Sequence, residues 1–199
     1  MQKIILFLLV SISVTFASSD EYIKEQYLKS YNYEQIQKYN EAIKVLAPLY
    51  KQYPKTYALN LRIGWLYYLN KNYNSAIYYY ENALKINIYS LDTRLGLIRI
   101  YLDTYSFHKA EIKAYELLKV DYYNYYANLY AIKALIAQKK YSIATNIVKK
   151  ILYLYPTDIK YLEQLAIIYK LTNNTLLKKL YQDILILDPN NVLVRSDIG

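Results

Sequence analysis

Small and aromatic side chains return along the chain with a constant spacing of 34 residues. Four alanines mark this period, at Ala42, Ala76, Ala110 and Ala144. An aromatic residue precedes each alanine by three positions, at Tyr39, Tyr73, Phe107 and Tyr141. Pro54 and Pro156 each follow their alanine by twelve residues. Three separate markers with one period predict an array of helix–turn–helix repeats.

Each marker has a physical cause. A small residue permits two helices to cross closely, an aromatic ring fills the space beside the crossing, and proline ends the second helix. No repeat can bury its apolar face alone, so neighbouring repeats must stack into one continuous core. The chain has only four prolines and three glycines, too few for the frequent turns of a β-sandwich or barrel. The pattern therefore predicts an all-α fold.

This pattern resembles the tetratricopeptide repeat (TPR). Repeat 2 carries the resemblance best, with Gly64, Tyr67, Tyr73, Ala76, Tyr80 and Ala83 at the family's positions. The resemblance implies a right-handed α-solenoid of about five TPR-like helix–turn–helix repeats within residues 20–199. The repeats would span residues 23–56, 57–90, 91–124, 125–158 and 159–191, followed by a short C-terminal tail.

The later repeats depart from the pattern. Ile98 and Ile132 stand where repeat 2 has Gly64, and we expect these larger residues to widen the crossings in repeats 3 and 4. In repeat 5 the position of the marker alanine is taken by Leu177 or Lys178. We also expect a short loop between the two helices of this repeat.

The tail after repeat 5 is short and largely apolar. Its apolar residues are Val192, Leu193, Val194 and Ile198. Terminal repeats need a polar outer face for solubility, so we expect these residues to fold back on repeat 5. Self-association through the C-terminal end is the alternative.

The first nineteen residues read as a secretory signal peptide. Lys3 supplies a positive start, and Ile4–Phe16 form an apolar run before the small residues Ala17-Ser18-Ser19. A retained membrane anchor and a buried cytosolic helix are the alternatives. No other apolar stretch reaches the roughly 18 residues of a transmembrane helix, so no span is expected in the mature chain. We therefore expect an exported, periplasmic protein of a bacterial envelope.

In the TPR family, the first helix of each repeat lines a concave groove. Carried over by position, the resemblance implies a partner-binding groove formed by Leu61, Trp65, Tyr68, Leu95, Arg99, Tyr126, Leu129 and Lys133. The same positions in repeats 1 and 5 are Lys24, Tyr27, Tyr31, Glu34, Lys160, Glu163, Ile167 and Lys170. Such a groove is apolar and aromatic at one end and basic toward the other, which suits an extended or helical peptide with aromatic anchors and some negative charge. Two alternatives remain: the leucines can belong to the core, and Arg99 and Lys133 can be merely solvated.

Composition narrows the function further. The chain has 29 tyrosines, which either form an adhesive aromatic surface or reflect an AT-rich genome. Lys and Arg exceed Asp and Glu by 25 − 16 = 9, but export and the scatter of these charges argue against nucleic acid. An anionic envelope polymer, or its export machinery, is a possible partner.

The sequence contains few of the residues and motifs that catalysis commonly uses. The chain has no cysteine and one histidine, His108, so thiolate metal sites and cysteine nucleophiles are excluded. The three glycines cannot supply a phosphate-binding loop. The sequence predicts a non-catalytic protein–protein interaction scaffold without cofactor or metal, whose partner is a protein or peptide. A docking or carrier module for an anionic envelope polymer is the alternative.

Overall fold

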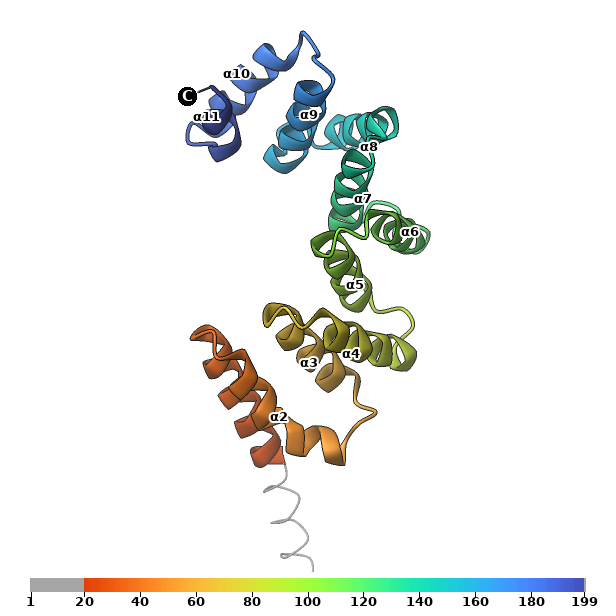
Figure 1. Cartoon of the computed structure of the whole chain (residues 1–199), viewed down its shortest axis with the longest axis vertical. Coiled ribbons are helices and arrows are strands. Elements are labelled where there is room, and N and C mark those ends of the chain that lie inside the picture. The colour runs from red at the N-terminus through yellow and green to blue at the C-terminus, as the bar shows by residue number, and fades with distance from the viewer. Residues whose placement is uncertain (1–19, 199) are drawn as a thin grey trace, which may run out of the picture. The chain divides into compact units, whose positions relative to one another are not determined.

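The structure is a computed structural model that describes residues 20–198, all of them in helices and connecting turns (Figure 1). The predicted signal peptide, Met1–Ser19, lies outside the described residues. Residues 20–35 are helical. The helices that follow are α2 (Tyr39–Gln52), α3 (Tyr57–Leu69), α4 (Tyr73–Ile86), α5 (Leu91–Asp103), α6 (Phe107–Leu118), α7 (Tyr125–Ala137), α8 (Tyr141–Leu154), α9 (Ile159–Leu171), α10 (Leu177–Leu187) and α11 (Val192–Ile198).

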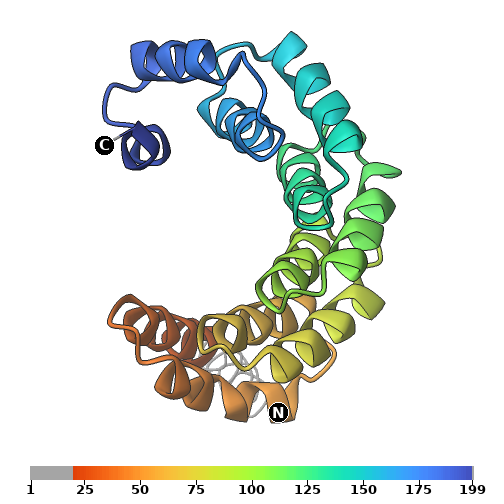
Figure 2. The same cartoon turned by 45° about the horizontal axis from the view of Figure 1, so that its top comes forward.

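The helices come in consecutive pairs, one pair in each predicted repeat, and α11 occupies the predicted tail. The chain divides into two compact bodies. The N-terminal body comprises the described residues up to Thr93, and the C-terminal body begins at Arg94 within α5. Each body is described by itself. Within the C-terminal body, Figure 2 shows α7 and α9 in one row and α6, α8 and α10 in another.

The marker alanines lie where the pattern predicts close helix contact. Ala42, Ala76, Ala110 and Ala144 are all fully buried. The absence of a side chain at Gly64 has a specific cause. A Cβ atom there would lie 2.8 Å from Cδ1 of Tyr80, so the glycine of α3 makes room for an aromatic ring of α4. Ile98 and Ile132 are also fully buried, and the wider crossings expected at them stay a prediction.

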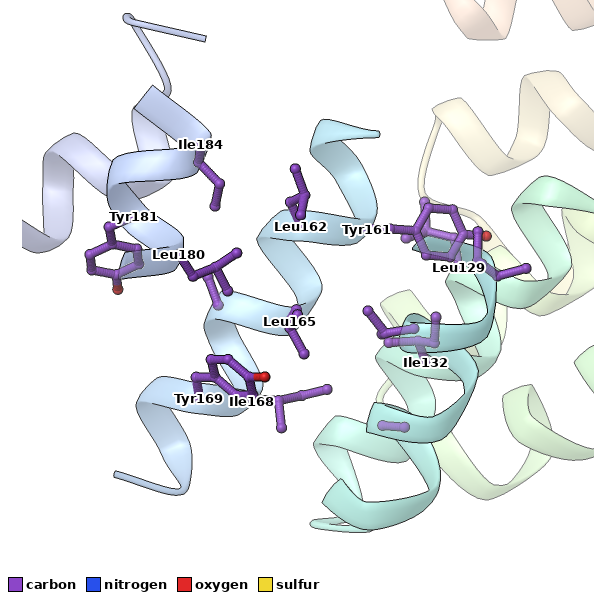
Figure 3. Packing of buried hydrophobic residues seen from close by; sticks show 14 of the residues in the cluster. Leu129, Ile132, Tyr161, Leu162, Leu165, Ile168, Tyr169, Leu180, Tyr181 and Ile184 are labelled. Carbon is purple, nitrogen blue, oxygen red and sulfur yellow. The ribbon is translucent and has the colours of Figure 1, made fainter. Parts of the chain in front are cut away.

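Each body has its own apolar core. In the N-terminal body, Leu46 and Leu49 of α2 pack with Leu59 and Ile63 of α3. In the C-terminal body, the core extends from α7 to α11. Figure 3 shows Leu165 of α9 lying between the apolar side chains of α7 and those of α10. Helix α9 thus buries surface against more than one neighbour, as stacked repeats require.

The turn inside every repeat has the same backbone. One residue in each turn has a positive φ between 51° and 59°, at Gln37, Lys71, Tyr105, Lys139 and Asn173. These positions are also 34 residues apart, yet none is glycine. In repeat 2, the amide of Lys71 donates to the carbonyl of Tyr68 (2.9 Å), and the amide of Asn72 donates to that of Tyr67 (2.9 Å). Such a left-handed residue closes a helix end by satisfying its last carbonyls.

The prediction of a short loop between the two helices of repeat 5 is wrong. Five residues separate α9 from α10, whereas three separate α3 from α4. The other repeats begin their second helix at an aromatic residue, and repeat 5 has Thr175 there. Without that ring to pack, the chain makes an additional turn, in which the side chain of Asn174 accepts from the amide of Leu176 (2.9 Å).

The C-terminal tail folds back in part. Val194 is fully buried and Leu193 packs against the core, but Val192 and Ile198 are exposed. The expectation that all four apolar residues are covered is therefore wrong for these two, because a single short helix can turn only one face to α9 and α10.

Polar contacts hold α11 in place. Lys170 of α9 forms an ion pair with Asp197 (2.6 Å), and Tyr181 of α10 donates to the same carboxylate. These two hydrogen bonds lower the pKa of Asp197 below its usual value. Asn191 also donates to Glu163 (2.8 Å). Self-association through this end stays a prediction.

Relief of the left-handed backbone at Lys71 should stabilise the N-terminal body. Glycine adopts positive φ without steric cost, so Lys71→Gly should raise the free energy of unfolding by roughly 0.5–1 kcal/mol. The control, Lys44→Gly within α2, should lower it by about 1 kcal/mol. Urea denaturation measures both values. Loss of stability in Lys71→Gly would contradict the described turn.

Gly64→Ala should lower the free energy of unfolding, although the same substitution within a helix usually raises it. Alanine normally stabilises a helix over glycine by about 0.5–1 kcal/mol. Here its Cβ would clash with the Tyr80 ring, so we expect a net loss of roughly 1–3 kcal/mol in thermal or urea unfolding. Adding Tyr80→Leu should recover part of that loss. A stabilised Gly64→Ala variant would show that the two helices are further apart.

Candidate binding clefts

A wide cleft of the N-terminal body lies between residues 20–35 and helix α3, and we call it the N-terminal cleft. Its volume is about 820 Å³. Aromatic and apolar side chains dominate its walls, with a few polar groups among them. The lining residues are Tyr27, Tyr31, Glu34, Gln35, Gln37, Tyr39, Tyr57, Ala58, Leu61, Arg62, Trp65 and Leu69.

A polar network orders one wall of the N-terminal cleft. Arg62, only 7% exposed, forms an ion pair with Glu34 and donates to the hydroxyl of Ser30 (3.1 Å). Trp65 Nε1 donates to the other oxygen of Glu34 (2.7 Å). The guanidinium carbon of Arg62 also lies 3.8 Å from the centre of the Tyr31 ring. These contacts fix the indole and the guanidinium in one arrangement.

This network leaves the cleft with little net charge, because Arg62 and Glu34 neutralise each other. Burial raises the pKa of Tyr27, so its hydroxyl stays protonated at neutral pH. A cleft with immobilised aromatic walls and few charges favours apolar or aromatic side chains of a partner, with hydrogen bonds at its rim.

The structure places two of the three groove residues predicted in repeat 2 within this cleft. Leu61 and Trp65 line it. Tyr68 stacks on Trp65, with ring centroids 5.4 Å apart, but it is not among the lining residues. Tyr27, Tyr31 and Glu34, taken from the same positions of repeat 1, also line the cleft.

A smaller cleft in the C-terminal body lies between α7 and α9, and we call it the C-terminal cleft. Its volume is about 320 Å³, and its lining residues are Tyr125, Tyr126, Leu129, Tyr130, Lys133, Lys160, Glu163 and Gln164. Nζ of Lys160 lies 3.5 Å from Oε2 of Glu163, so the two side chains form an ion pair. Burial and the nearby carboxylate of Asp158 raise the pKa of Tyr125 to about 12, so this tyrosine stays neutral.

The predicted groove residues of the C-terminal body divide into three groups. Tyr126, Leu129 and Lys133 meet in the C-terminal cleft. Arg99 lies beside it, where Nε and Nη2 both donate to the Tyr130 hydroxyl (3.3 Å each). Leu95 is half-buried and lines neither cleft. Leu129 also belongs to the buried core, as the alternative interpretation expected, and its role in binding a partner stays a prediction.

Sequence reasoning missed Arg62 and Ser30. Both are buried polar residues, and the position-by-position transfer selected only the residues that face a groove. One signal was available: Arg62 is the single charged residue in the helix Tyr57–Leu69, and such a residue needs a counter-charge nearby.

No catalytic constellation is evident in the described part of the chain. The side chain of His108 is 76% exposed, and its Nδ1 atom lies 4.0 Å from Glu111. Residues 20–198 contain no group of three or more His, Cys, Asp or Glu side chains arranged to hold a metal ion. None of the described helices is long and apolar enough to cross a membrane.

Solved structures with the same arrangement of helices are TPR proteins. A tetratricopeptide repeat protein from Parabacteroides merdae matches with a TM-score of 0.79 and 18% identity, over 88% of this chain and 70% of that one. YrrB, described as a TPR protein with an unusual peptide-binding site, matches with a TM-score of 0.68 and 11% identity, over 84% of this chain and 87% of that one.

A further match is MamA from Desulfovibrio magneticus, with a TM-score of 0.71 and 14% identity, over 89% of this chain and 98% of that one. No protein-family model and no curated protein matches the sequence. At these identities the likeness concerns the fold, and it confirms the all-α TPR-type fold expected from the 34-residue period.

Glu34 and Arg62 form the ion pair that orders the N-terminal cleft, and their contributions to the free energy of unfolding should be strongly coupled. Glu34→Leu would leave the guanidinium of Arg62 without its counter-charge. We expect a loss of roughly 2–3 kcal/mol, less than the about 3–5 of fully enclosed pairs, because Glu34 remains 22% exposed. Glu34→Leu combined with Arg62→Met should lose much less than the two single variants together. Additive losses in urea denaturation would show that the pair is not coupled.

Proposed function

We propose that this chain is a non-catalytic interaction scaffold that binds a peptide or protein segment in the N-terminal cleft. The observation that carries the proposal is the cleft itself, about 820 Å³ in volume and walled by aromatic side chains. Its Trp65 and Arg62 are held by Glu34 before any partner arrives. Binding then costs little side-chain entropy, which favours affinity.

The residue types support a protein partner. Tryptophan, tyrosine and arginine contribute most of the binding energy in protein interfaces, and all three line the N-terminal cleft. Because Arg62 already has its counter-charge, the preferred segment carries an aromatic or aliphatic anchor rather than a charge. The peptide-binding site named for YrrB agrees with this proposal as an analogy of fold.

We further propose that the protein works outside the bacterial cytoplasm, in the periplasm. The support for this setting is the sequence of Met1–Ser19, with its single lysine, apolar run and small residues. An exported scaffold of this type would hold together components of the cell envelope.

The alternative function, docking of an anionic envelope polymer, concerns the C-terminal body. Lys133 and Lys160 line the C-terminal cleft, but Lys160 lies near Glu163, which lowers the local positive charge. A polymer partner predicts binding that falls steeply with salt. A peptide anchored by apolar contacts predicts weak salt dependence.

The N-terminal cleft is tested by selecting binding peptides from a displayed random library and measuring their affinities by calorimetry. We expect Trp65→Ala to weaken the selected peptides by about 2 kcal/mol or more, as for a central interface residue. Leu61→Ser should weaken them less. Circular dichroism checks that each variant is folded.

The matched control is Tyr89→Ala, which removes an aromatic ring that is 74% exposed and outside the cleft. It should leave the affinities unchanged. If the peptides bind Trp65→Ala as well as the unaltered protein, the partner site lies elsewhere.

A further inference from the structure

Repeat 3 departs from the geometry of the other repeats at the end of its second helix. Helix α6 has 12 residues, whereas α2, α4 and α8 have 14 each. Helix α10 has 11, mainly because it begins two residues later in its repeat. Six residues then separate α6 from α7, whereas four separate α4 from α5. The 34-residue period is kept because the turn gains what the helix loses. Near the end of α6, side chains of α8 remain partly uncovered, among them Ile143, which is 48% exposed.

A pocket occupies the uncovered space, and we call it the α6–α8 pocket. Its volume is about 290 Å³, near the lower limit of typical ligand pockets. The lining residues are Tyr115, Leu118, Tyr122, Tyr123, Asn128, Ile143, Asn146, Ile147, Lys150 and Ile151. Those of α8 recur with helical spacing, so one face of α8 forms one side of the pocket. Such a volume accepts one large side chain rather than a whole helix.

The equivalent place in the N-terminal body is occupied by tyrosine rings. Tyr50 and Tyr79 meet there, with ring centroids 5.1 Å apart. Two repeats later, the corresponding residues are Leu118 and Ile147. The fold therefore permits this position to be filled from within, and in the C-terminal body smaller side chains leave it open.

The aromatic wall of the pocket is not required by the repeat. Tyr122 stands where repeats 1 and 4 have Pro54 and Pro156. Tyr122 and Tyr123 are each 56% exposed, and their rings meet edge to face at 4.9 Å. Exposed rings that neither end a helix nor fill the core stabilise the fold little, so they are available for a partner.

The rim of the pocket carries a positive charge. The ammonium of Lys150 lies 4.1 Å from the centre of the Tyr122 ring, which holds the cation beside the apolar opening. No described carboxylate forms an ion pair with it at 4.0 Å or less. A partner that fills the pocket and also carries a carboxylate would supply both the apolar contact and the counter-charge.

We propose that the α6–α8 pocket is a second docking site, which receives a large apolar side chain adjacent to an acidic residue in a partner peptide segment. The apolar side chain occupies the space beside Leu118 and Ile147, and the acidic residue pairs with Lys150. This site is separate from the N-terminal cleft and does not depend on its function. It would allow the scaffold to hold two segments at once.

The probe is a set of short, capped peptides that differ only at two central residues: Phe-Asp, Phe-Asn, Phe-Lys and Ser-Asp. Titration into protein with ¹³C-labelled isoleucine methyl groups reports binding at Ile143 and Ile147. We expect saturable shifts of these methyl signals with Phe-Asp, weaker binding with Phe-Asn and none with Ser-Asp. Equal affinities for Phe-Asp and Phe-Lys would overturn the proposed acidic preference.

Two lysine variants give a matched pair. Lys150→Glu should weaken the Phe-Asp peptide by about fivefold, the upper range for an exposed ion pair. Lys149→Glu makes the same change of net charge at an adjacent exposed residue that does not line the pocket, and it should leave the affinity unchanged. Equal weakening by both variants would show that only general charge attraction is involved.

Ile147→Tyr tests occupancy by filling the pocket from within, because it places a tyrosine where the N-terminal body has Tyr79. We expect a folded protein in which the remaining reporter, the methyl signal of Ile143, no longer responds to Phe-Asp. Trp65→Ala should retain the response, which separates this site from the N-terminal cleft. A protein that associates with itself in sedimentation, and loses that association in Ile147→Tyr, would assign the pocket to a second copy and overturn the proposal.

Discussion

Close contact between helices at small residues is the constraint on which the rest of the structure depends. A repeat of two short helices cannot bury its apolar face alone, so its stability comes from the neighbours against which it stacks. Fully buried alanines at 34-residue intervals permit that approach, and Gly64 lets a tyrosine ring of α4 lie against α3. Side chains on the faces not used for stacking are then free to form clefts, whose residues can change without loss of the fold.

The sequence predicted the helix pairs well because the small residues needed at each helix crossing recur with the 34-residue period. It did not predict the left-handed residue in each turn, although that residue has the same period. Gln37, Lys71, Tyr105 and Lys139 share a backbone conformation but no side-chain chemistry. The turn is held by hydrogen bonds of the main chain, so it does not require a particular residue type that the sequence would show. The longer loop of repeat 5 was missed for a related reason, since a lost aromatic residue does not say where the next helix begins.

The candidate sites were predicted in part. Positions copied from the repeat placed Leu61 and Trp65 in one cleft, and Leu129 and Lys133 in another, because the period fixes which residues share a helix face. Arg62 was missed since its role depends on Glu34 in a different repeat, a pairing that no single repeat contains. The α6–α8 pocket arises where repeat 3 keeps the period but changes the lengths of its second helix and the following turn, so a search for the period passes over it.

The central claim is that a partner segment binds beside Trp65. Trp65 is the only tryptophan in the chain, and it lines the N-terminal cleft, so its fluorescence reports on that cleft alone. Titration with a selected peptide should produce a saturable change in the indole emission, with the same dissociation constant that calorimetry gives. Binding seen by calorimetry while the emission of Trp65 stays unchanged would contradict the account.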